Sequence, residues 1–120
     1  MSLEIAVRKQ DNVAVVDLSG RITLGEASGR LRDTIKGLVT DNTKDILLNL
    51  EGVTYMDSSG LGELVGAFAT VSNRGGRLKL FGLQPRVHEL MNITKLYSVF
   101  EIFPDEAQAM QSFRTATASR

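Results

Sequence analysis

The segment Asp57-Ser58-Ser59-Gly60 places two hydroxyl groups between an apolar run and the start of a helical pattern. The first backbone N–H groups of a helix have no partner within the helix, and the helix dipole favours negative charge there. A phosphoryl group on Ser58 or Ser59 would therefore be stabilised at this position. A serine can also simply cap the helix, which contributes about 1 kcal/mol. Local chemistry favours the cap and leaves both interpretations open.

Other chemistries that use such a turn lack essential residues. With no cysteine, and with His88 as the only histidine, the chain has no metal-ligand set of usual spacing, and His88 is interpreted as an ordinary helix residue. A serine hydrolase would need Gly-x-Ser-x-Gly and a histidine base. A nucleotide-hydrolysing loop would need Lys-Ser or Lys-Thr after its glycines, which leaves only weak nucleotide contact open. A phosphate-accepting receiver aspartate at Asp57 would need acidic magnesium ligands, and Asp11 lies in a predicted turn.

Two glycines, Gly62 and Gly66, interrupt the helix that is predicted after this turn. On a helical wheel they lie opposite or beside the apolar stripe, together with Glu63, Thr70 and Asn73. Glycine inside a helix costs about 1 kcal/mol relative to alanine, so these positions need a reason. Either another part of the domain approaches them closely, or the low surface admits a partner.

Hydrophobic periodicity predicts strands and helices that alternate along the chain. Strands are expected at residues 3–7, 13–19, 46–50, 77–81 and 99–103. Helices are expected from Thr23 to Leu38, from Ser59 to Gly75, from Pro85 to Thr94 and from Pro104 to Phe113. This order predicts an α/β fold with a mixed sheet that opens with an antiparallel hairpin and packs against about four helices. We expect one domain over residues 1–114, followed by a frayed tail over 115–120.

Several residues are expected at particular places in these elements. Gly20 closes the second strand, and Thr23 and Glu26 have the spacing of a capping box, with Leu24 on the apolar stripe of the helix that follows. The run 46–50 is typical of a central strand that is covered on both faces. The buried side of the helix after Ser59 is expected to comprise Leu61, Leu64, Val65, Phe68 and Ser72, and that of the helix after Pro85 to comprise Val87, Leu90, Met91 and Thr94.

Charge and composition exclude two classes of partner. Fourteen Lys and Arg residues balance fourteen Asp and Glu residues, and no basic run is present, so neither direct nucleic-acid binding nor attraction to a membrane surface is expected. The sequence shows no secretory pattern at its start, and no apolar run approaches the roughly 20 residues that span a bilayer. We therefore expect a cytoplasmic protein.

The sequence resembles the STAS domain family, and within it the bacterial anti-sigma factor antagonists. The resemblance extends over nearly the whole chain, and its most specific part is Tyr55-Met56-Asp57-Ser58-Ser59-Gly60-Leu61-Gly62. Further matching residues are Gly20, Asn49-Leu50, Gly75-Gly76, Ile93-Thr94 and Leu96.

The resemblance implies that the protein regulates transcription by switching between partners and that it is not an enzyme. Such a protein, when unphosphorylated, binds an anti-sigma factor and so frees the sigma factor. The anti-sigma factor is also a serine kinase with its own ATP and magnesium, and it phosphorylates the serine after the aspartate, here Ser58, with Ser59 as a second candidate. A separate serine phosphatase restores the binding form. The implied partner surface comprises Asp57, Ser58, Ser59, Gly60, Gly62, Glu63, Gly66, Arg21 and Thr23.

Two residues depart from the family pattern. Arg21 stands where an acidic residue is common, and Lys95 stands where a glycine is common. An alternative that accommodates Arg21 is a STAS scaffold in a stress-signalling or transport complex, without phosphorylation and with Ser58 as a helix cap. The sequence does not indicate the oligomeric state.

Overall fold

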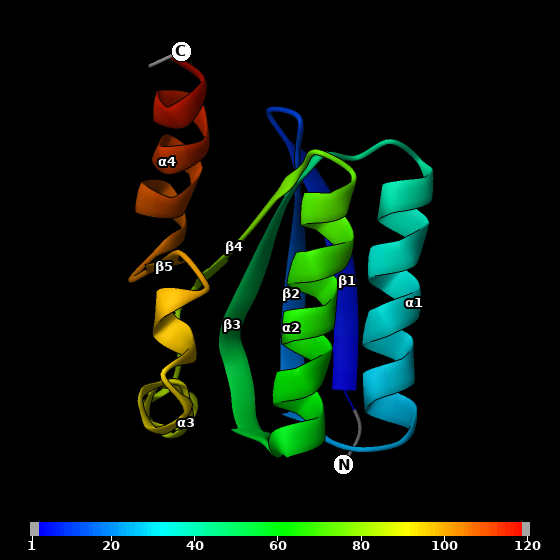
Figure 1. Ribbon diagram of the computed structural model, residues 1–120, viewed down its shortest axis with the longest axis vertical. Helices are drawn as coiled ribbons and strands as arrows, with labels where there is room; N and C mark the ends of the chain where they lie inside the picture. Colours follow the sequence, from blue (N-terminus) through cyan, green and yellow to red (C-terminus); the bar gives the residue numbers. More distant parts are fainter. Residues whose placement is uncertain (1–2, 119–120) are drawn as a thin grey trace.

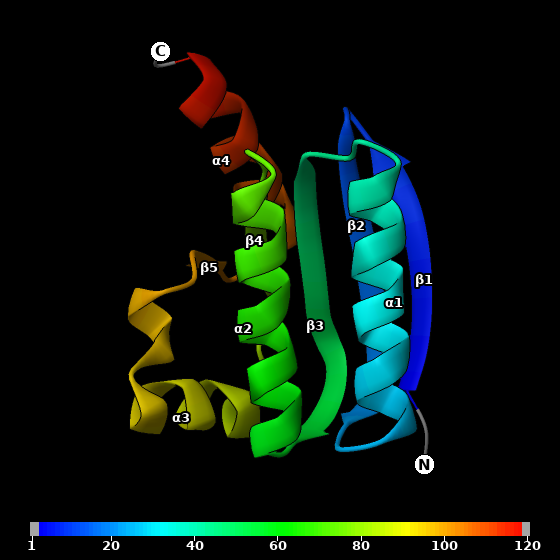
Figure 2. The same ribbon diagram turned by 45° about the vertical axis from the view of Figure 1, so that its right-hand side comes forward.

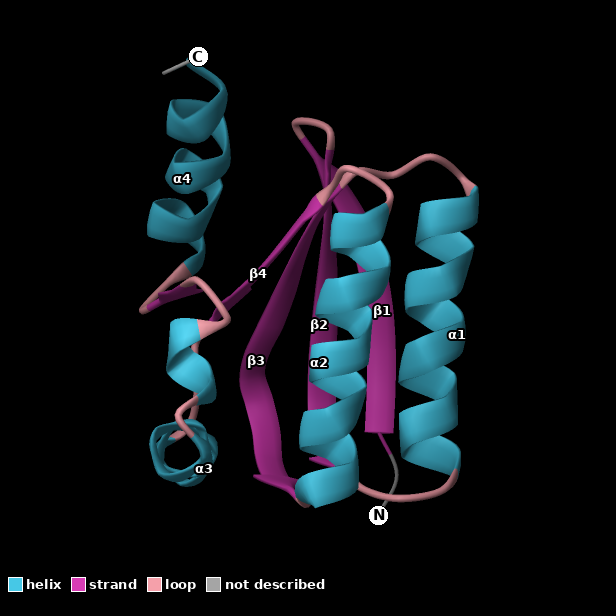
Figure 3. Cartoon of the chain, viewed as in Figure 1, coloured by secondary structure: helices cyan, strands magenta, loops and turns pink. Residues whose placement is uncertain are grey.

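The computed structural model describes residues 3–118 (Figure 1 and Figure 3). The elements follow in the order β1 (Leu3–Gln10), β2 (Val13–Ile22), α1 (Glu26–Thr40), β3 (Asp45–Met56), α2 (Ser58–Asn73), β4 (Arg77–Phe81), α3 (Pro85–Thr94), a short 3₁₀ turn (Leu96–Ser98), β5 (Ile102–Phe103) and α4 (Glu106–Ala118).

The predicted hairpin is formed by β1 and β2, which pair in antiparallel fashion. Its two-residue turn, Asp11 and Asn12, has φ angles of 52° and 70°. Two consecutive positive φ angles are typical of a type I′ turn, whose twist matches that of the flanking strands. The turn therefore sets the register of β1 on β2.

The described strands form one mixed sheet in the order β1-β2-β3-β4-β5, in which every pair after the hairpin is parallel. β3 lies at its centre, as the run 46–50 predicted. Ile46 and Leu48 join the core under α1 and α2, whereas Leu47 joins the core under α4. Coverage on both faces explains why this strand is almost continuously apolar. The predicted fold class is confirmed.

The bounds of four strands differ from the prediction. β1 continues to Gln10, so Lys9 and Gln10 lie in the strand and not in the turn, and β3 continues past residue 50 to Met56. β2 does not end at Gly20 but continues to Ile22, because Gly20 adopts a φ of 113° and allows an irregular register with β3 without breaking the strand. The last strand is shorter than predicted. Val99 and Phe100 follow the 3₁₀ turn, so that only Ile102 and Phe103 pair with β4.

The helices lie in separate layers on the sheet. α1 and α2 run side by side on one face, and α4 lies on the other (Figure 1 and Figure 2). α3 packs through Val87 and Met91 into the same core as α1 and α2. Because α2 begins directly after β3, the Asp57 turn lies where the carboxyl end of the central strand meets the start of a helix.

The start of α1 corrects two predictions. The helix begins at Glu26 with Gly25 as its N-cap and without a side-chain cap, so Thr23 and Glu26 form no capping box. The Thr23 carbonyl instead accepts a hydrogen bond from the Ser28 hydroxyl at 2.8 Å. Leu24 lies before the helix and is 77% exposed, so it does not belong to the apolar stripe.

The buried sides of α2 and α3 differ from the predicted stripes in a few positions. Ser72 is exposed, and its neighbour Val71 is buried instead. Ala67 is also buried. In the second half of α2, the residues that face the sheet are thus one position before the predicted ones. In α3, Leu90 is half-buried and Thr94, in the last turn, is exposed.

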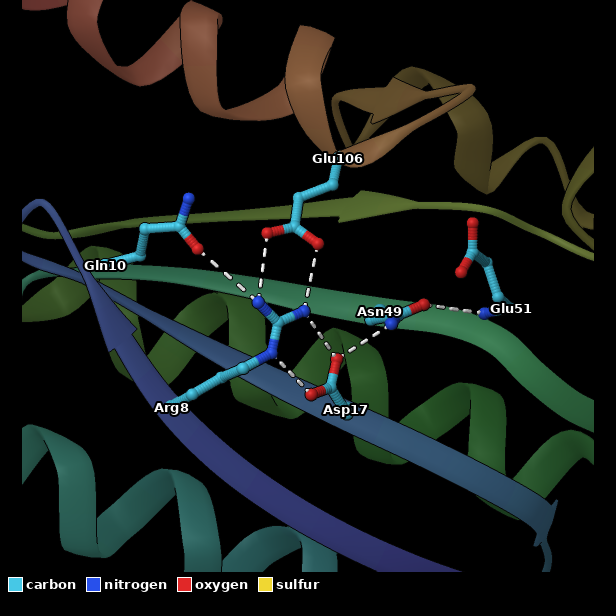
Figure 4. A network of polar contacts seen from close by, with 6 residues as sticks. All are labelled: Arg8, Gln10, Asp17, Asn49, Glu51 and Glu106. Carbon is cyan, nitrogen blue, oxygen red and sulfur yellow. Dashed lines mark hydrogen bonds and ion pairs between the residues drawn. The ribbon is translucent and has the colours of Figure 1, made fainter.

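A polar network joins α4 to the hairpin (Figure 4). Arg8 donates hydrogen bonds to Asp17 at 2.7 Å and to Glu106 at 2.9 Å, and Asn49 donates to Asp17 at 2.7 Å. The guanidinium of Arg8 holds the pKa of the Asp17 carboxyl below its usual value. Ion pairs with this much solvent exposure contribute little stability, so the network chiefly fixes the orientation of α4.

The last helix is longer than the sequence predicted. Residues 115–118, which were assigned to a tail, continue α4 to Ala118, and residues 119 and 120 lie outside the described part of the chain. In residues 3–118, no helix has the length and apolar character needed to cross a bilayer.

Candidate functional site

Asp57 caps α2 and fixes the turn before it. Its backbone is extended, with φ −98° and ψ −175°, as is typical of an N-cap that follows a strand. Its Oδ1 accepts a hydrogen bond from the Gly60 N–H at 2.8 Å, and its Oδ2 accepts one from the Leu24 N–H at 3.2 Å. The carboxylate thus ties the loop before α1 to the start of α2. The interpretation of a serine as the helix cap is wrong.

With Asp57 as the cap, the two serine side chains have no part in holding the turn. Ser58 is the first residue of α2 and is exposed, and Ser59 is the second and is half-buried. Among residues 3–118, neither hydroxyl has a hydrogen-bond partner. The Ser58 hydroxyl is therefore free for modification and more accessible than that of Ser59, a distinction that the sequence did not provide.

The hydrogen bonds to Asp57 also change its acidity. The N–H of Gly60, supported by that of Leu24, holds the pKa of the Asp57 carboxyl below its usual value. Backbone donors favour the charged form, and the positive end of the helix dipole acts in the same direction. Asp57 is therefore ionised at neutral pH, and a fixed negative charge lies beside the Ser58 hydroxyl.

The lowered pKa of Asp57 predicts an acid-dependent stability. A carboxyl whose pKa is lower in the folded than in the unfolded chain stabilises the fold above the unfolded value of about 3.9, and this stabilisation is lost as the pH falls through the folded pKa. We expect Asp57→Asn to be less stable than the wild type at neutral pH and to lose less on acidification. Urea unfolding at several pH values between about 7 and 2.5 measures both effects.

Asp33→Asn provides the control for this experiment, because Asp33 is an exposed residue of α1 that caps no helix. The Asp33 variant should follow the wild-type pH dependence. If Asp57→Asn follows it as well, the capping carboxylate has no role in stability.

Three glycines that look alike in the sequence have different surroundings. A Cβ atom at Gly60 would overlap the Ile22 carbonyl oxygen and lie 2.9 Å from Met56 Cγ. Gly60 is therefore buried for packing, and its predicted place on a partner surface is not supported. A Cβ atom at Gly62 or Gly66 would meet nothing within 4 Å. Close approach by another part of the domain, the first explanation for these two glycines, is therefore wrong, and the outer side of α2 is an open surface.

Glu63 lies on the same open side but is not a free anion. It accepts two hydrogen bonds from Arg32 of α1, at 2.8 and 3.0 Å. The pair crosses the shallow hollow between α1 and α2, which Gly66 also lines. A phosphoryl group on Ser58 would thus meet the negative charge of Asp57 more directly than that of Glu63.

Arg21 and Thr23 lie near the turn in different settings. The guanidinium carbon of Arg21 lies 4.6 Å from the centroid of the Tyr55 ring, and that of Arg86 lies 5.8 Å from the same centroid. A cation over an aromatic face is a favourable contact, so Arg21 of β2, which departs from the family pattern, has a defined place over the ring of Tyr55 on β3. Thr23 is half-buried, at the beginning of the loop that Asp57 holds.

Leu24 is a residue that the sequence reasoning missed. Its backbone N–H is bonded to Asp57, and its side chain is 77% exposed. An apolar side chain in water beside the Ser58 turn is suited to burial against a partner. The signal that could have found it is Gly25, whose φ of 106° keeps the chain from entering the helix one residue earlier.

The remaining candidate, His88, lies on the exposed side of α3, where its ring nitrogen is 3.4 Å from the side-chain amide of Asn92. Within residues 3–118, no group of three or more His, Cys, Asp or Glu residues is arranged to hold a metal ion.

Comparison with known proteins identifies the class to which this fold and turn belong. The model of the STAS domain family matches residues 4–109, and the chain is a member of the STAS domain family. The anti-sigma-B factor antagonist of Bacillus subtilis (strain 168) is 35% identical over 102 residues, which make up 85% of this chain and 92% of that protein.

Solved structures show the same fold. An anti-sigma factor antagonist from Mycobacterium paratuberculosis superposes with a TM-score of 0.82 at 23% identity and covers 94% of this chain and 95% of that one. The Bacillus cell fate determinant SpoIIAA, in its phosphorylated form, gives a TM-score of 0.72 at 20% identity and covers 92% of this chain and 99% of that one. The resemblance inferred from the sequence is confirmed at the level of family and fold.

Proposed function

We propose that this protein is an anti-sigma factor antagonist that is switched by phosphorylation at Ser58. Unphosphorylated, it binds an anti-sigma factor with serine kinase activity and so releases the sigma factor. The name of the Bacillus subtilis relative supports the regulatory role. The observation that supports Ser58 as the phosphorylation site is that Asp57, and not a serine, caps α2. The Ser58 hydroxyl therefore stays exposed and unbonded beside an open helix surface.

The proposed partner surface is centred on Ser58 and extends to either side of it. The outer side of α2 at Gly62 and Gly66 provides a low surface on which another chain can lie closely. On the other side, exposed Leu24 provides apolar area next to the carboxylate of Asp57. Protein interfaces combine an apolar core with a polar rim, and Leu24 would add apolar area to such a core.

The switch follows from the charge that phosphorylation adds. A phosphoserine carries about −1.5 to −2 charges at pH 7, and on Ser58 it would stand beside the carboxylate of Asp57. In the free protein, water and the start of α2 stabilise the phosphoryl group, and the phosphorylated SpoIIAA structure supports the compatibility of this fold with a phosphoryl group. In a complex, the same two anions would be covered by the partner, which is costly without cations to pair with them.

The size of the effect favours a charge over a lost hydrogen bond as the cause of release. Changing a complex from mostly bound to mostly free takes about 5.5 kcal/mol. A single buried neutral hydrogen bond that is lost costs about 1–3 kcal/mol, which is too little. In this proposal ATP and magnesium belong to the partner kinase, a separate phosphatase removes the phosphoryl group, and this chain acts as substrate and regulator.

Phosphate transfer with the native partner tests the proposal. The tagged protein is used to capture its partner from the producing cell, and the recovered complex is then incubated with ATP and magnesium. We expect a partner with a nucleotide-binding kinase fold, an increase in intact mass equal to one phosphoryl group, and dissociation of the complex. Ser58→Ala should accept no phosphoryl group, whereas Ser59→Ala should accept one. Recovery of a transporter subunit without any change in mass would favour the scaffold alternative.

A further inference from the structure

A groove lies between α4 and the neighbouring strands β4 and β5, on the face of the sheet opposite α1 and α2. Its volume is about 690 Å³, within the range of sites that hold small organic molecules. Its exposed surface is mainly apolar. The residues that line it are Arg77, Lys79, Glu101, Phe103, Ala107, Gln108, Gln111 and Ser112.

The wall of this groove contains a buried cation. The side chain of Lys79 is only 4% exposed, because α4 covers the face of β4 from which it projects. Its Nζ donates a hydrogen bond to the Ser112 hydroxyl at 2.9 Å and lies 4.6 Å from the centroid of the Phe113 ring. Neither contact carries a negative charge, so the ammonium group depends on a carboxylate for compensation.

That carboxylate belongs to Glu101, which is poorly suited to hold its place. Its Oε1 lies 3.1 Å from Lys79 Nζ, but the Glu101 side chain is 66% exposed. A long side chain in contact with water loses conformational freedom when it pairs, and the attraction is screened, so such pairs are weak. The other cation of the groove, Arg77, is held by two hydrogen bonds to Asp45, at 2.8 and 3.0 Å. Lys79 is thus the cation whose counter-ion is easily displaced.

We propose that this groove binds a small aromatic carboxylate. The carboxylate of the ligand takes the place of Glu101 at Lys79 Nζ, and Ser112 keeps its hydrogen bond to the ammonium group. The ring of the ligand lies against Phe103 and Ala107, in the apolar part of the groove. Aromatic rings prefer offset or edge-to-face contact with one another, which the half-buried ring of Phe103 allows. The site lies on the other face of the sheet from Ser58 and does not depend on the proposed phosphorylation.

Titration of the isotope-labelled protein with 2-naphthoate, followed by NMR, tests the proposal. We expect saturable shifts of the amide signals of Lys79, Glu101 and Phe103, with those of the Asp57 turn unmoved. The neutral analogue 2-naphthamide has nearly the same size and should bind at least about tenfold more weakly, because it carries no negative charge to pair with the Lys79 ammonium group. Equal affinity for the two probes, or shifts located elsewhere, would overturn the proposal.

Two substitutions are expected to act in opposite directions on the same measurement. Lys79→Met shortens the side chain by one atom and removes its charge, so affinity for 2-naphthoate should fall at least about tenfold, whereas affinity for 2-naphthamide should change far less. Glu101→Gln removes the competing carboxylate from an exposed position and should raise affinity for 2-naphthoate about threefold or more. Unchanged or weaker binding by Glu101→Gln contradicts the proposal even if Lys79→Met fails to fold.

Discussion

Ser58→Asp is expected to weaken binding of the anti-sigma partner by at least about 100-fold and to leave the fold intact. The substitution puts a second anion beside the ionised Asp57, and covering both costs several kcal/mol, of which each 1.4 kcal/mol is a tenfold change in affinity. In the free protein the new carboxylate lies at the start of α2, where negative charge is tolerated, so the free energy of unfolding should change by no more than about 0.5 kcal/mol. Isothermal titration calorimetry with the captured partner and urea unfolding measure the two quantities.

Ser58→Asn is the matched control, since Asn has nearly the same size and shape as Asp but no charge. It should retain binding within about tenfold of the wild type, which corresponds to about one lost hydrogen bond. The difference between Asp and Asn should shrink as salt is added, because screening weakens repulsion between charges that remain near water. If Asn weakens binding as strongly as Asp, shape and not charge controls the complex, and the proposed switch is wrong.

The order of strands and helices could be predicted because each element carries its own hydrophobic period. The run 46–50 is apolar on both sides, and such a strand can only lie at the centre of a covered sheet. A hairpin turn was predicted at the polar residues 9–12, and the positive φ angles of Asp11 and Asn12 place it there, although Lys9 and Gln10 belong to β1. The Asp57 turn was found for a similar reason, because an apolar strand and a helical pattern meet there.

The atoms that hold the turn could not be predicted, because neighbouring residues have similar capping ability. Asp57, Ser58 and Ser59 all rank among the favoured N-cap residues, and a shift of one position moves the cap from a hydroxyl to a carboxylate. The structure selects Asp57, since its Oδ2 also bonds the Leu24 N–H of a loop that is distant in sequence. Thr23 is the opposite case. It has the capping-box spacing to Glu26, but the N-cap of α1 is Gly25, two residues later.

Burial that depends on distant elements was equally hidden. Lys79 alternates with Leu78 and Leu80, a pattern that by itself does not distinguish a solvent-facing lysine from a buried one. α4, which follows nearly 30 residues later, covers it. Gly60 and Gly66 pose the same problem, since both are glycines of one helix, and only the position of Ile22 on a neighbouring strand shows that Gly60 is packed and Gly66 is not.

Gly60→Ala is expected to lower the free energy of unfolding by about 3 kcal/mol or more, the upper part of the range for overpacked sites. The added Cβ would overlap the Ile22 carbonyl oxygen, which belongs to β2 and also accepts the Asp57 N–H at 3.3 Å. Neither β2 nor α2 can move without disturbing the hydrogen bonds of Asp57, so the overlap cannot be relieved without a large cost in free energy. For a domain of this size the loss corresponds to about 10–15 °C in Tm, which calorimetry or circular dichroism measures.

Gly66→Ala makes the same chemical change in the same helix with the opposite expected sign. Its Cβ meets nothing within 4 Å, so the variant should gain up to about 1 kcal/mol from the better helix propensity of alanine. Because the open side of α2 is part of the proposed partner surface, the same variant should bind the anti-sigma partner more weakly although it is more stable. A Gly66→Ala variant that is more stable and binds as tightly as the wild type would show that the partner does not use this side of α2. Equal stability of the two alanine variants would contradict the packing assigned to Gly60.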